Sequence, residues 1–393
     1  MAILAGKIEG ETKLALYSHH FDTEQNKMMI GKVIAETAPF PTKKYEIRGE
    51  NGKILNIKAM LEDFLNQVYY GRENSFGEGI EKNILGACFG IASNIEGDKD
   101  NKKVRIFRPA LDLNVTFSES DFKMQLPCPD VPVAFINDMV AIGKSFLGQK
   151  EAQLNVLYQG TKQADTKERK VIMLVGEGLG QALWYWDEKN ERLEPVSSEG
   201  GHTLFAPRTK REYELGLYLL ENCPPKSSNG ISVPIYYEYV LSAPGLVRIY
   251  EFLKSRGEYG SESSELRQIL EQNNTDPAPI IDKATKDSDS LSIAALNLFI
   301  EIMGARAGDL ALTYEAKGGI YINNFIDFEN LPNSQLIFRD AFLDKENKFR
   351  QYNEEISVYV YQQKDSVLLG SACYAVDNGF VTKGKFAYKR MNR

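Results

Sequence analysis

The chain is poor in cysteine and histidine and carries no excess of positive charge. It has three histidines and four cysteines in 393 residues, and no two cysteines form a CxxC pair. The cysteines are Cys88, Cys128, Cys223 and Cys373. A zinc knuckle and a disulfide framework are therefore disfavoured, and a reducing, cytoplasmic setting is favoured. The formal net charge of −7 argues against a nucleic-acid-binding surface, which would be basic.

Long apolar runs are also scarce. The segment Met1–Lys7 has too short an apolar run for a signal peptide. We expect no window to reach the roughly 18 apolar residues of a membrane-spanning helix. Hydrophobic residues make up 43% of the chain and charged residues 26%, which is typical of an ordinary globular protein. We expect small molecules or proteins as partners, with neither nucleic acid nor membrane among them.

Apolar runs of strand length alternate with helical spacing, which indicates an α/β fold. Strand patterns cover 84–91, 133–136 and 171–175, and helical spacing covers 60–68 and 291–312. A length of 393 residues suggests two domains, each able to bury its own core. We expect a small lobe of residues 1–148, joined by a C-terminal helix at about 366–393, and a large lobe of residues 149–365, with a cleft between them.

Two local patterns refine this fold. Ile3–Ala5 and Leu14–Tyr17 are expected to form a hairpin, with Gly6 and Gly10 in the turn that joins them. Asp287–Ser290 offers N-caps for the helix predicted over 291–312.

Asp138 stands where a predicted strand meets a predicted helix. The apolar run Val133–Ile136 leads into Asn137 and Asp138, and ligands collect at such strand ends in open α/β sheets. A carboxylate there can accept the proton of a sugar hydroxyl during phosphoryl transfer. A structural role fits the local sequence equally well, because Asp is a good helix N-cap and Asn often forms turns.

Glu199 and His202 flank a Gly200-Gly201 pair. The glycines allow a tight turn, so both side chains can face one ligand. A lone histidine is more often structural, and one histidine with scattered carboxylates lacks the spacing of a metal site, so no metal site is expected. Glu238 fits an exposed helix face as well as a binding role.

These segments occur together in an order that resembles the bacterial glucokinases, from about residue 3 to 375. The matching motifs are Ile136-Asn137-Asp138, Glu199-Gly200-Gly201-His202, Glu238–Leu246, Gly318–Ile322 and Leu368–Ala372. The resemblance implies the two-lobed actin-like ATPase (ribonuclease H-like) fold, closing over glucose or a similar hexose. It implies Asp138 as the base for the 6-hydroxyl, with hydrogen bonds to the sugar from Asn137, Asp138, Glu199, His202 and Glu238. A homodimer is common among the proteins that the chain resembles.

The resemblance also implies ATP with Mg²⁺, held by segments rich in glycine. The matching residues are Gly6, Lys7, Gly10, Gly176, Gly178, Gly180, Gly318 and Gly319. The chain departs from the family pattern at all three segments. Lys7 replaces an acid that anchors the metal, the loop 176–180 lacks a threonine and gains Glu177, and Asn323-Asn324 replaces a Gly-Gly pair. The added acids would repel phosphate, although Lys7 could contact phosphate directly.

The sequence leaves three hypotheses open. The first is an ATP-dependent glucokinase, the second is an inactive glucose-binding pseudokinase with a sensing or regulatory role, and the third is an interaction protein that keeps only the fold. The carboxylates around the predicted sugar site favour the first two. The altered phosphate segments separate the first from the second.

Overall fold

The computed structural model describes most of the chain and divides it into two compact units. The described residues are 2–9, 11–22, 27–49, 52–70, 84–93, 95–98, 101–108, 112–126, 131–147, 154–189, 191–227, 230–272, 275–361 and 365–380. Unit 1 comprises Met1–Lys150 and Lys364–Arg393, and unit 2 comprises Glu151–Gln363. Each unit has its own hydrophobic core.

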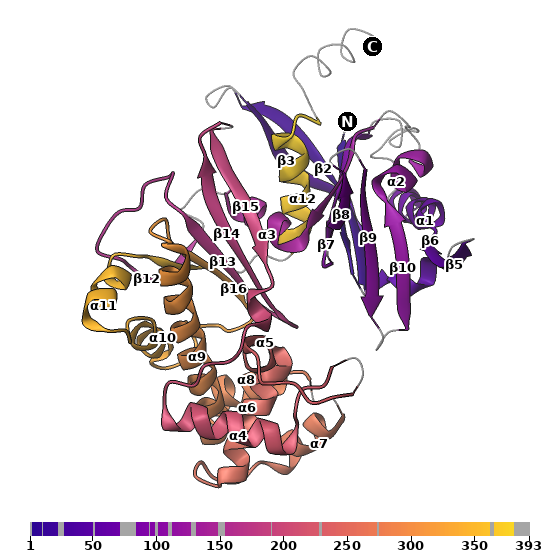
Figure 1. The fold of residues 1–393 in the computed structure, drawn as a ribbon. Coiled ribbons are helices and arrows are strands. Elements are labelled where there is room, and N and C mark those ends of the chain that lie inside the picture. The colour runs from indigo at the N-terminus through magenta and orange to yellow at the C-terminus, as the bar shows by residue number, and fades with distance from the viewer. Residues whose placement is uncertain are drawn as a thin grey trace. The chain divides into compact units, whose positions relative to one another are not determined.

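Unit 1 contains two β-sheets (Figure 1). The first has the order β11-β7-β1-β2-β3, with β4 paired to β2, and the second has the order β5-β6-β10-β9-β8. The strands are β1 (Ala2–Ile8), β2 (Glu11–Asp22), β3 (Lys27–Glu36), β4 (Phe40–Pro41), β5 (Glu46–Gly49), β6 (Gly52–Leu55), β7 (Ile84–Ile91), β8 (Ile95–Asp98), β9 (Asn101–Arg108), β10 (Leu113–Ser118) and β11 (Val133–Asn137). The helices are η1 (Thr42–Tyr45), α1 (Ile57–Tyr70), α2 (Glu119–Gln125), α3 (Asp138–Leu147) and α12 (Ser366–Asp377).

The first sheet of unit 1 has a parallel centre. β7 runs parallel to both β1 and β11, and the register places Ile8 and Asn137 opposite Ile91. Every residue of β7 is buried, as expected for a strand covered on both faces. α3 and α12 pack against each other and against β7. The carboxyl ends of three parallel strands therefore meet at one edge, where Asn137 and Asp138 lie.

The N-terminal hairpin differs from the prediction. β1 extends to Ile8, so Gly6 lies within the strand, opposite Leu14, and not in the turn. A side chain at Gly6 would collide with the ring of Phe89 on the neighbouring strand. Gly10 lies outside the described residues. The glycine at position 6 therefore serves close packing between strands, which the local turn pattern could not show.

Unit 2 is built around one sheet of order β12-β17-β16-β13-β14-β15 (Figure 1). Its strands are β12 (Asn155–Tyr158), β13 (Lys170–Val175), β14 (Leu179–Asp187), β15 (Arg192–Ser198), β16 (Ile320–Asn324) and β17 (Val358–Val360). Its helices are η5 (Gly200–His202), α4 (Lys210–Asn222), α5 (Tyr237–Val240), α6 (Ala243–Arg256), α7 (Ser264–Gln272), α8 (Ala278–Lys286), α9 (Ser290–Tyr314), α10 (Ser334–Phe342) and α11 (Asn347–Glu354). β13, β16 and β17 are parallel, whereas β13, β14 and β15 form an antiparallel meander.

α9 is the central helix of unit 2. It begins after Asp289, whose side chain accepts a hydrogen bond from the Ser292 backbone at 2.8 Å, which confirms the predicted N-cap region. By length and composition α9 could cross a membrane, so the expectation that no segment would pass such a test was wrong. However, 72% of its most apolar window is buried within the protein, against α6, α8 and α10. Its apolar character is therefore that of a core helix.

The C-terminal helix is shorter in the described chain than we expected. α12 ends at Asp377, and Gly379 follows with a φ of 72°, in the left-handed region that often ends helices. Residues 381–393 of the expected helix lie outside the described residues.

Candidate active site

Asn137 and Asp138 lie at the carboxyl end of β11, at the start of α3. The Asn137 side-chain oxygen accepts a hydrogen bond from the Met139 backbone N–H at 2.9 Å. Asn137 therefore performs the local turn role that the sequence allowed. Asp138 is a half-buried residue, and it lies at the strand end in the first turn of α3.

The environment of Asp138 shifts its proton affinity. Burial raises the pKa of Asp138 to about 6, and the negative charge of Glu9 adds to the effect, while the Met139 N–H and the positive charge of Lys7 oppose it. Glu9 and Lys7 form an ion pair of 2.7 Å beside the end of β1. A carboxyl with this pKa is mostly ionised at neutral pH yet more basic than an ordinary aspartate, which suits a general base.

In unit 2, Gly176, Gly178 and Gly180 lie at the turn from β13 to β14. The Gly176 N–H donates to the Gly178 carbonyl at 2.9 Å, and Gly180 pairs with Leu174 inside the hairpin. The loop after β13 is thus a three-residue hairpin turn, and a plain turn was the alternative to a phosphate cradle that the sequence left open. Glu177 is exposed at its tip.

Glu238 contacts this glycine turn directly. Its carboxylate accepts a hydrogen bond from the Leu179 N–H at 2.9 Å. A side chain at Gly178 would lie 2.6 Å from the same carboxylate oxygen, so glycine makes room for Glu238. Glu238 sits in α5, whose preceding residue Tyr236 lies near His202, with ring centroids 5.4 Å apart.

The segment that carries Glu199 and His202 packs against the backbone of Leu179. A side chain at Gly201 would collide with the Leu179 carbonyl, so glycine is required for η5 to approach β14 this closely. His202 Nε2 lies 3.9 Å from a Glu199 carboxylate oxygen, and their side chains are 55% and 76% exposed. Leu179 thus joins Glu238 to the Glu199–His202 segment, and the structure brings these three predicted residues of unit 2 together.

Arg306 on α9 makes hydrogen bonds to the segment that carries Glu199 and His202. The sequence did not identify Arg306 as a site residue. One guanidinium nitrogen lies 3.0 Å from the Gly200 carbonyl, 3.0 Å from the Gln181 side-chain oxygen and 3.1 Å from the Thr203 hydroxyl. The guanidinium also lies 4.2 Å from the ring centroid of Tyr237, the residue before Glu238. Arg306 is the single basic residue of the mostly apolar helix α9, and this was the available signal.

Gly318 and Gly319 lie elsewhere. They precede β16, and the register pairs Ile320 with Val171 at the amino end of β13, whereas Asn323 and Asn324 pair with Leu174 and Val175 beside the glycine turn. The structure therefore does not bring Gly318 and Gly319 to the turn at 176–180. A side chain at Gly318 would contact the Glu168 and Arg169 carbonyls, so packing accounts for this glycine.

The two-unit α/β architecture, with strand-end loops carrying carboxylates, defines a member of the actin-like ATPase fold. The solved glucokinase of an Antarctic psychrotroph has this fold at a TM-score of 0.67, with 24% identity over 96% of this chain and 99% of its own. A Streptomyces griseus ROK family glucokinase, solved with glucose and AMPPNP, matches at a TM-score of 0.57 and 14% identity over 96% of this chain and 100% of its own.

Sequence comparison places the chain more narrowly. The model of the Glucokinase family matches residues 43–378. The glucokinase of Nostoc punctiforme is 34% identical over 302 residues, which cover 74% of this chain and 81% of that relative. The chain belongs to the glucokinase family.

Proposed function

We propose that this protein is a sugar kinase that transfers a phosphoryl group from ATP to the 6-hydroxyl of glucose. Asp138 acts as the base, and Asn137, Glu199, His202 and Glu238 hydrogen-bond the sugar. The observation that carries the proposal is the convergence of Glu238 and the Glu199–His202 segment on Leu179, at the glycine turn. The exposed side chains of Glu199 and His202 can exchange water for sugar hydroxyls.

In the proposed reaction, Asp138 accepts the proton of the 6-hydroxyl. Phosphoryl transfer is mainly positioning and charge stabilisation, so the base orients the hydroxyl and accepts its proton as the new O–P bond forms. The pKa of about 6 keeps Asp138 ionised at neutral pH. The family membership and the pKa together support this role.

The residues fit the nucleotide only in part. A glycine turn at a strand end offers a close backbone approach for phosphates, and we propose that Gly178 contacts them, with ATP supplying the transferred phosphoryl group. The Gly176 N–H already donates to the Gly178 carbonyl, so Gly176 shapes the turn. The hairpin of unit 1 does not fit Mg²⁺ in the expected manner, because Lys7 stands at the position of the anchoring acid and pairs with Glu9. We therefore assign no Mg²⁺ ligand in this hairpin.

Product formation tests the proposal. The protein is mixed with glucose, ATP and Mg²⁺, and glucose 6-phosphate is followed by a coupled dehydrogenase. The proposal predicts equal amounts of glucose 6-phosphate and ADP. It is wrong if no product appears above a blank without protein at any glucose concentration up to 100 mM, roughly a hundredfold above the upper end of ordinary KM values.

The pseudokinase alternative has a specific observation in its favour. The Glu238 carboxylate already holds the Leu179 N–H of the glycine turn, and the exposed Glu177 adds negative charge at the turn tip. A protein of this second kind would be stabilised by glucose but not by ATP with Mg²⁺, because a ligand stabilises only a state that it binds. Thermal unfolding with each ligand separates the two functions, since the kinase must be stabilised by both.

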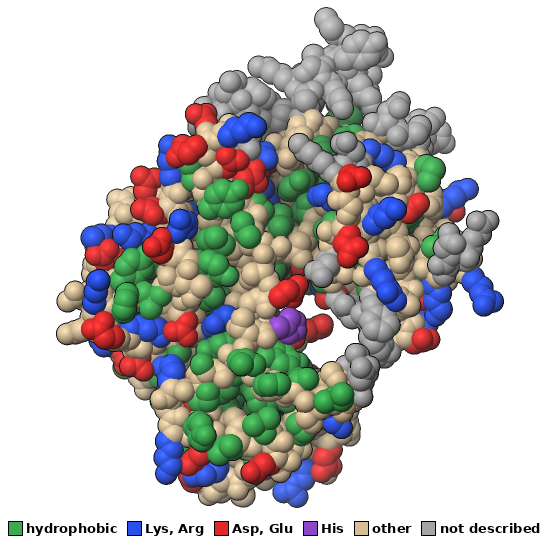
Figure 2. Space-filling view, in the orientation of Figure 1, with side chains coloured by type: hydrophobic (Ala, Val, Ile, Leu, Met, Phe, Trp, Pro, Cys, Tyr) green, Lys and Arg blue, Asp and Glu red, His purple; other side chains and the backbone are tan. Residues whose placement is uncertain are grey.

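We also propose that the protein is a cytoplasmic homodimer. Tyr213, Leu217 and Leu220 form an exposed apolar stripe on α4, with 45–61% of each side chain accessible. Figure 2 shows hydrophobic side chains gathered over the helical part of unit 2. Sedimentation velocity should show a dimer that dissociates in Leu217→Asp but persists in Leu336→Asp, whose site on α10 is equally exposed. A wild-type monomer at all concentrations would contradict the proposal.

A further inference from the structure

A pocket of about 530 Å³ lies at the amino end of the central strands of unit 2. Four separate segments line it: the loop before β13, the far end of β14, the turn after α9, and α11. The lining residues are Lys167, Glu168, Arg169, Tyr185, Trp186, Glu188, Glu315, Lys317 and Tyr352. Its volume lies within the range of pockets that bind small molecules, roughly 300–1,000 Å³.

This pocket is distinct from the candidate active site. Arg169 lines it immediately before β13 begins at Lys170, whereas the glycine turn follows the other end of the strand at Val175. A strand rises about 3.3 Å per residue, so the two ends of β13 are about 17 Å apart. Neither Glu199, His202 nor Glu238 lines the pocket.

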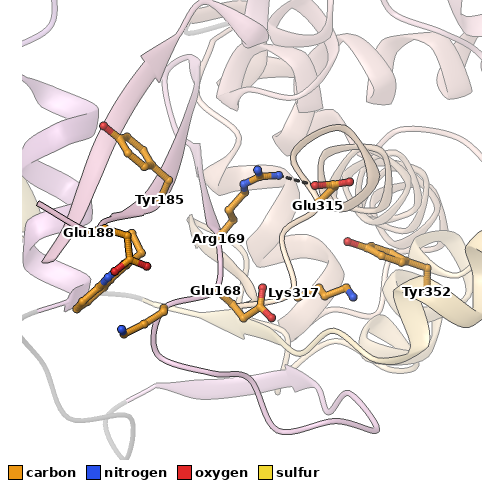
Figure 3. A pocket seen from close by; sticks show the side chains of 9 residues that line it. Glu168, Arg169, Tyr185, Glu188, Glu315, Lys317 and Tyr352 are labelled. Carbon is orange, nitrogen blue, oxygen red and sulfur yellow. Dashed lines mark hydrogen bonds and ion pairs between the residues drawn. The ribbon is translucent and has the colours of Figure 1, made fainter. Parts of the chain in front are cut away.

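The walls combine aromatic rings with charges of both signs. Figure 3 shows Tyr185 and Glu188 on one side and Tyr352 on the other, with Arg169, Glu168 and Lys317 between them. The Lys317 ammonium lies 5.4 Å from the ring centroid of Tyr352, and the Lys167 ammonium lies 4.9 Å from that of Trp186.

An ion pair fixes two of the four segments. The Arg169 guanidinium lies 2.5 Å from the Glu315 carboxylate, which ties the loop before β13 to the turn after α9 (Figure 3). This leaves two lysines and two glutamates whose charges face the pocket without an ion pair of their own among the described residues.

These features select the chemistry of a ligand. The lining carries three bases and three acids, so a phosphate anion or a simple cation would meet as much repulsion as attraction. An apolar ligand would desolvate the charges without replacing their hydrogen bonds. A sugar hydroxyl both donates to carboxylates and accepts from ammonium groups, and the C–H faces of a sugar ring pack on aromatic rings.

We propose that this pocket is a binding site for a neutral saccharide, separate from the site of phosphoryl transfer. Trp186 and Tyr352 provide the ring faces. Glu168 and Glu188 accept hydrogen bonds from the sugar, and Lys167 and Lys317 donate to it.

Tryptophan fluorescence reports on this pocket directly. The chain has two tryptophans, both on β14: Trp184 is fully buried and Trp186 lines the pocket. Titration of the full-length protein with maltose should change the emission in a saturable manner. The change should persist in Trp184→Phe and vanish in Trp186→Phe. Lys317→Ala should weaken maltose binding at least about tenfold by calorimetry, the effect of losing one charge-assisted hydrogen bond.

Matched variants separate this pocket from the active site. Lys210→Ala removes an exposed lysine of α4, and Glu238→Ala removes a residue of the proposed hexose site, so both should leave maltose binding unchanged. Absence of saturable maltose binding would overturn the proposal. So would binding that is lost in Glu238→Ala but kept in Lys317→Ala, or a pocket that binds glycylglycine or inorganic phosphate in preference to maltose.

Discussion

The carboxyl end of β11, an edge strand, and the carboxyl end of β13, an interior strand, position their candidate site residues by different means. At β11 a side chain dominates, since burial and the charge of Glu9 set the proton affinity of Asp138. At β13 the backbone dominates, since Gly178 and Gly201 let Glu238 and η5 approach Leu179. The first region should therefore be sensitive to isosteric changes of charge, and the second to the addition of a single methyl group.

Among the changes that test this contrast, Asp138→Asn should have the largest effect. Asn keeps the size of the side chain but cannot accept the proton, so kcat should fall about 10²–10⁴-fold, the usual contribution of a general base. The coupled assay measures the loss, and glucose binding by calorimetry should persist. A kcat within threefold of wild type would show that Asp138 is not the base.

Arg306→Met tests the support of the sugar-binding segment. Loss of the hydrogen bonds to Gly200 and Thr203 removes interactions of a charged donor, each worth about 1.5–3 kcal/mol, so the KM for glucose should rise roughly 10–100-fold. A positioning role predicts that Arg306→Lys recovers part of this loss. If KM is unchanged while only the melting temperature falls, Arg306 has a purely structural role.

Gly201→Ala tests the backbone side of the comparison. The added methyl group collides with the Leu179 carbonyl, and overpacking of this kind costs about 1–3 kcal/mol of the free energy of unfolding. Gly216→Ala is the matched control, because it lies in α4 with open space around it and should stabilise by roughly 0.5–1 kcal/mol. Chemical denaturation measures both, and equal stabilities would contradict the close approach at Leu179.

Glu9→Gln should have the smallest effect. Removing the negative charge of Glu9 lowers the pKa of Asp138, because it leaves the positive charge of Lys7 unopposed by Glu9. Wild-type kcat/KM should fall as the pH drops below about 6, because protonated Asp138 cannot act as a base. In Glu9→Gln this fall should move to lower pH by up to about one unit. A shift to higher pH, or none, would contradict the assigned charge effect, and Glu11→Gln is the control.

Local patterns predicted the elements best where burial is continuous. β7 covers Ile84–Ile91 as expected, and β11 and β13 begin and end within one residue of their predictions, because apolar runs bounded by polar residues define buried strands. The family resemblance supplied the fold, which no single pattern specified.

The positions of several residues depend on strand pairing and helix packing between segments distant in sequence, which the sequence alone did not reveal. Gly6 and Gly318 looked like residues of phosphate loops, but each faces a neighbouring strand or loop that is distant in sequence. Gly319 precedes β16 at one end of the sheet of unit 2, and the glycine turn follows β13 at the other end. This placement follows only from the pairing of Ile320 with Val171. Arg306 likewise contacts the candidate site only through the tertiary fold, in which its guanidinium donates a hydrogen bond to the Gly200 carbonyl of η5. Motif order along a chain does not determine which end of a sheet a motif occupies.

Calorimetric titration with glucose tests the central claim most directly, because it asks whether the segments around Leu179 bind a hexose at all. We predict a saturable binding step in the wild-type protein that is lost in Glu199→Ala and in Glu238→Ala but kept in Glu188→Ala, whereas any glucose bound in the separate pocket would be lost in Glu188→Ala instead. Glucose binding of equal affinity in the wild type, Glu199→Ala and Glu238→Ala would contradict the account.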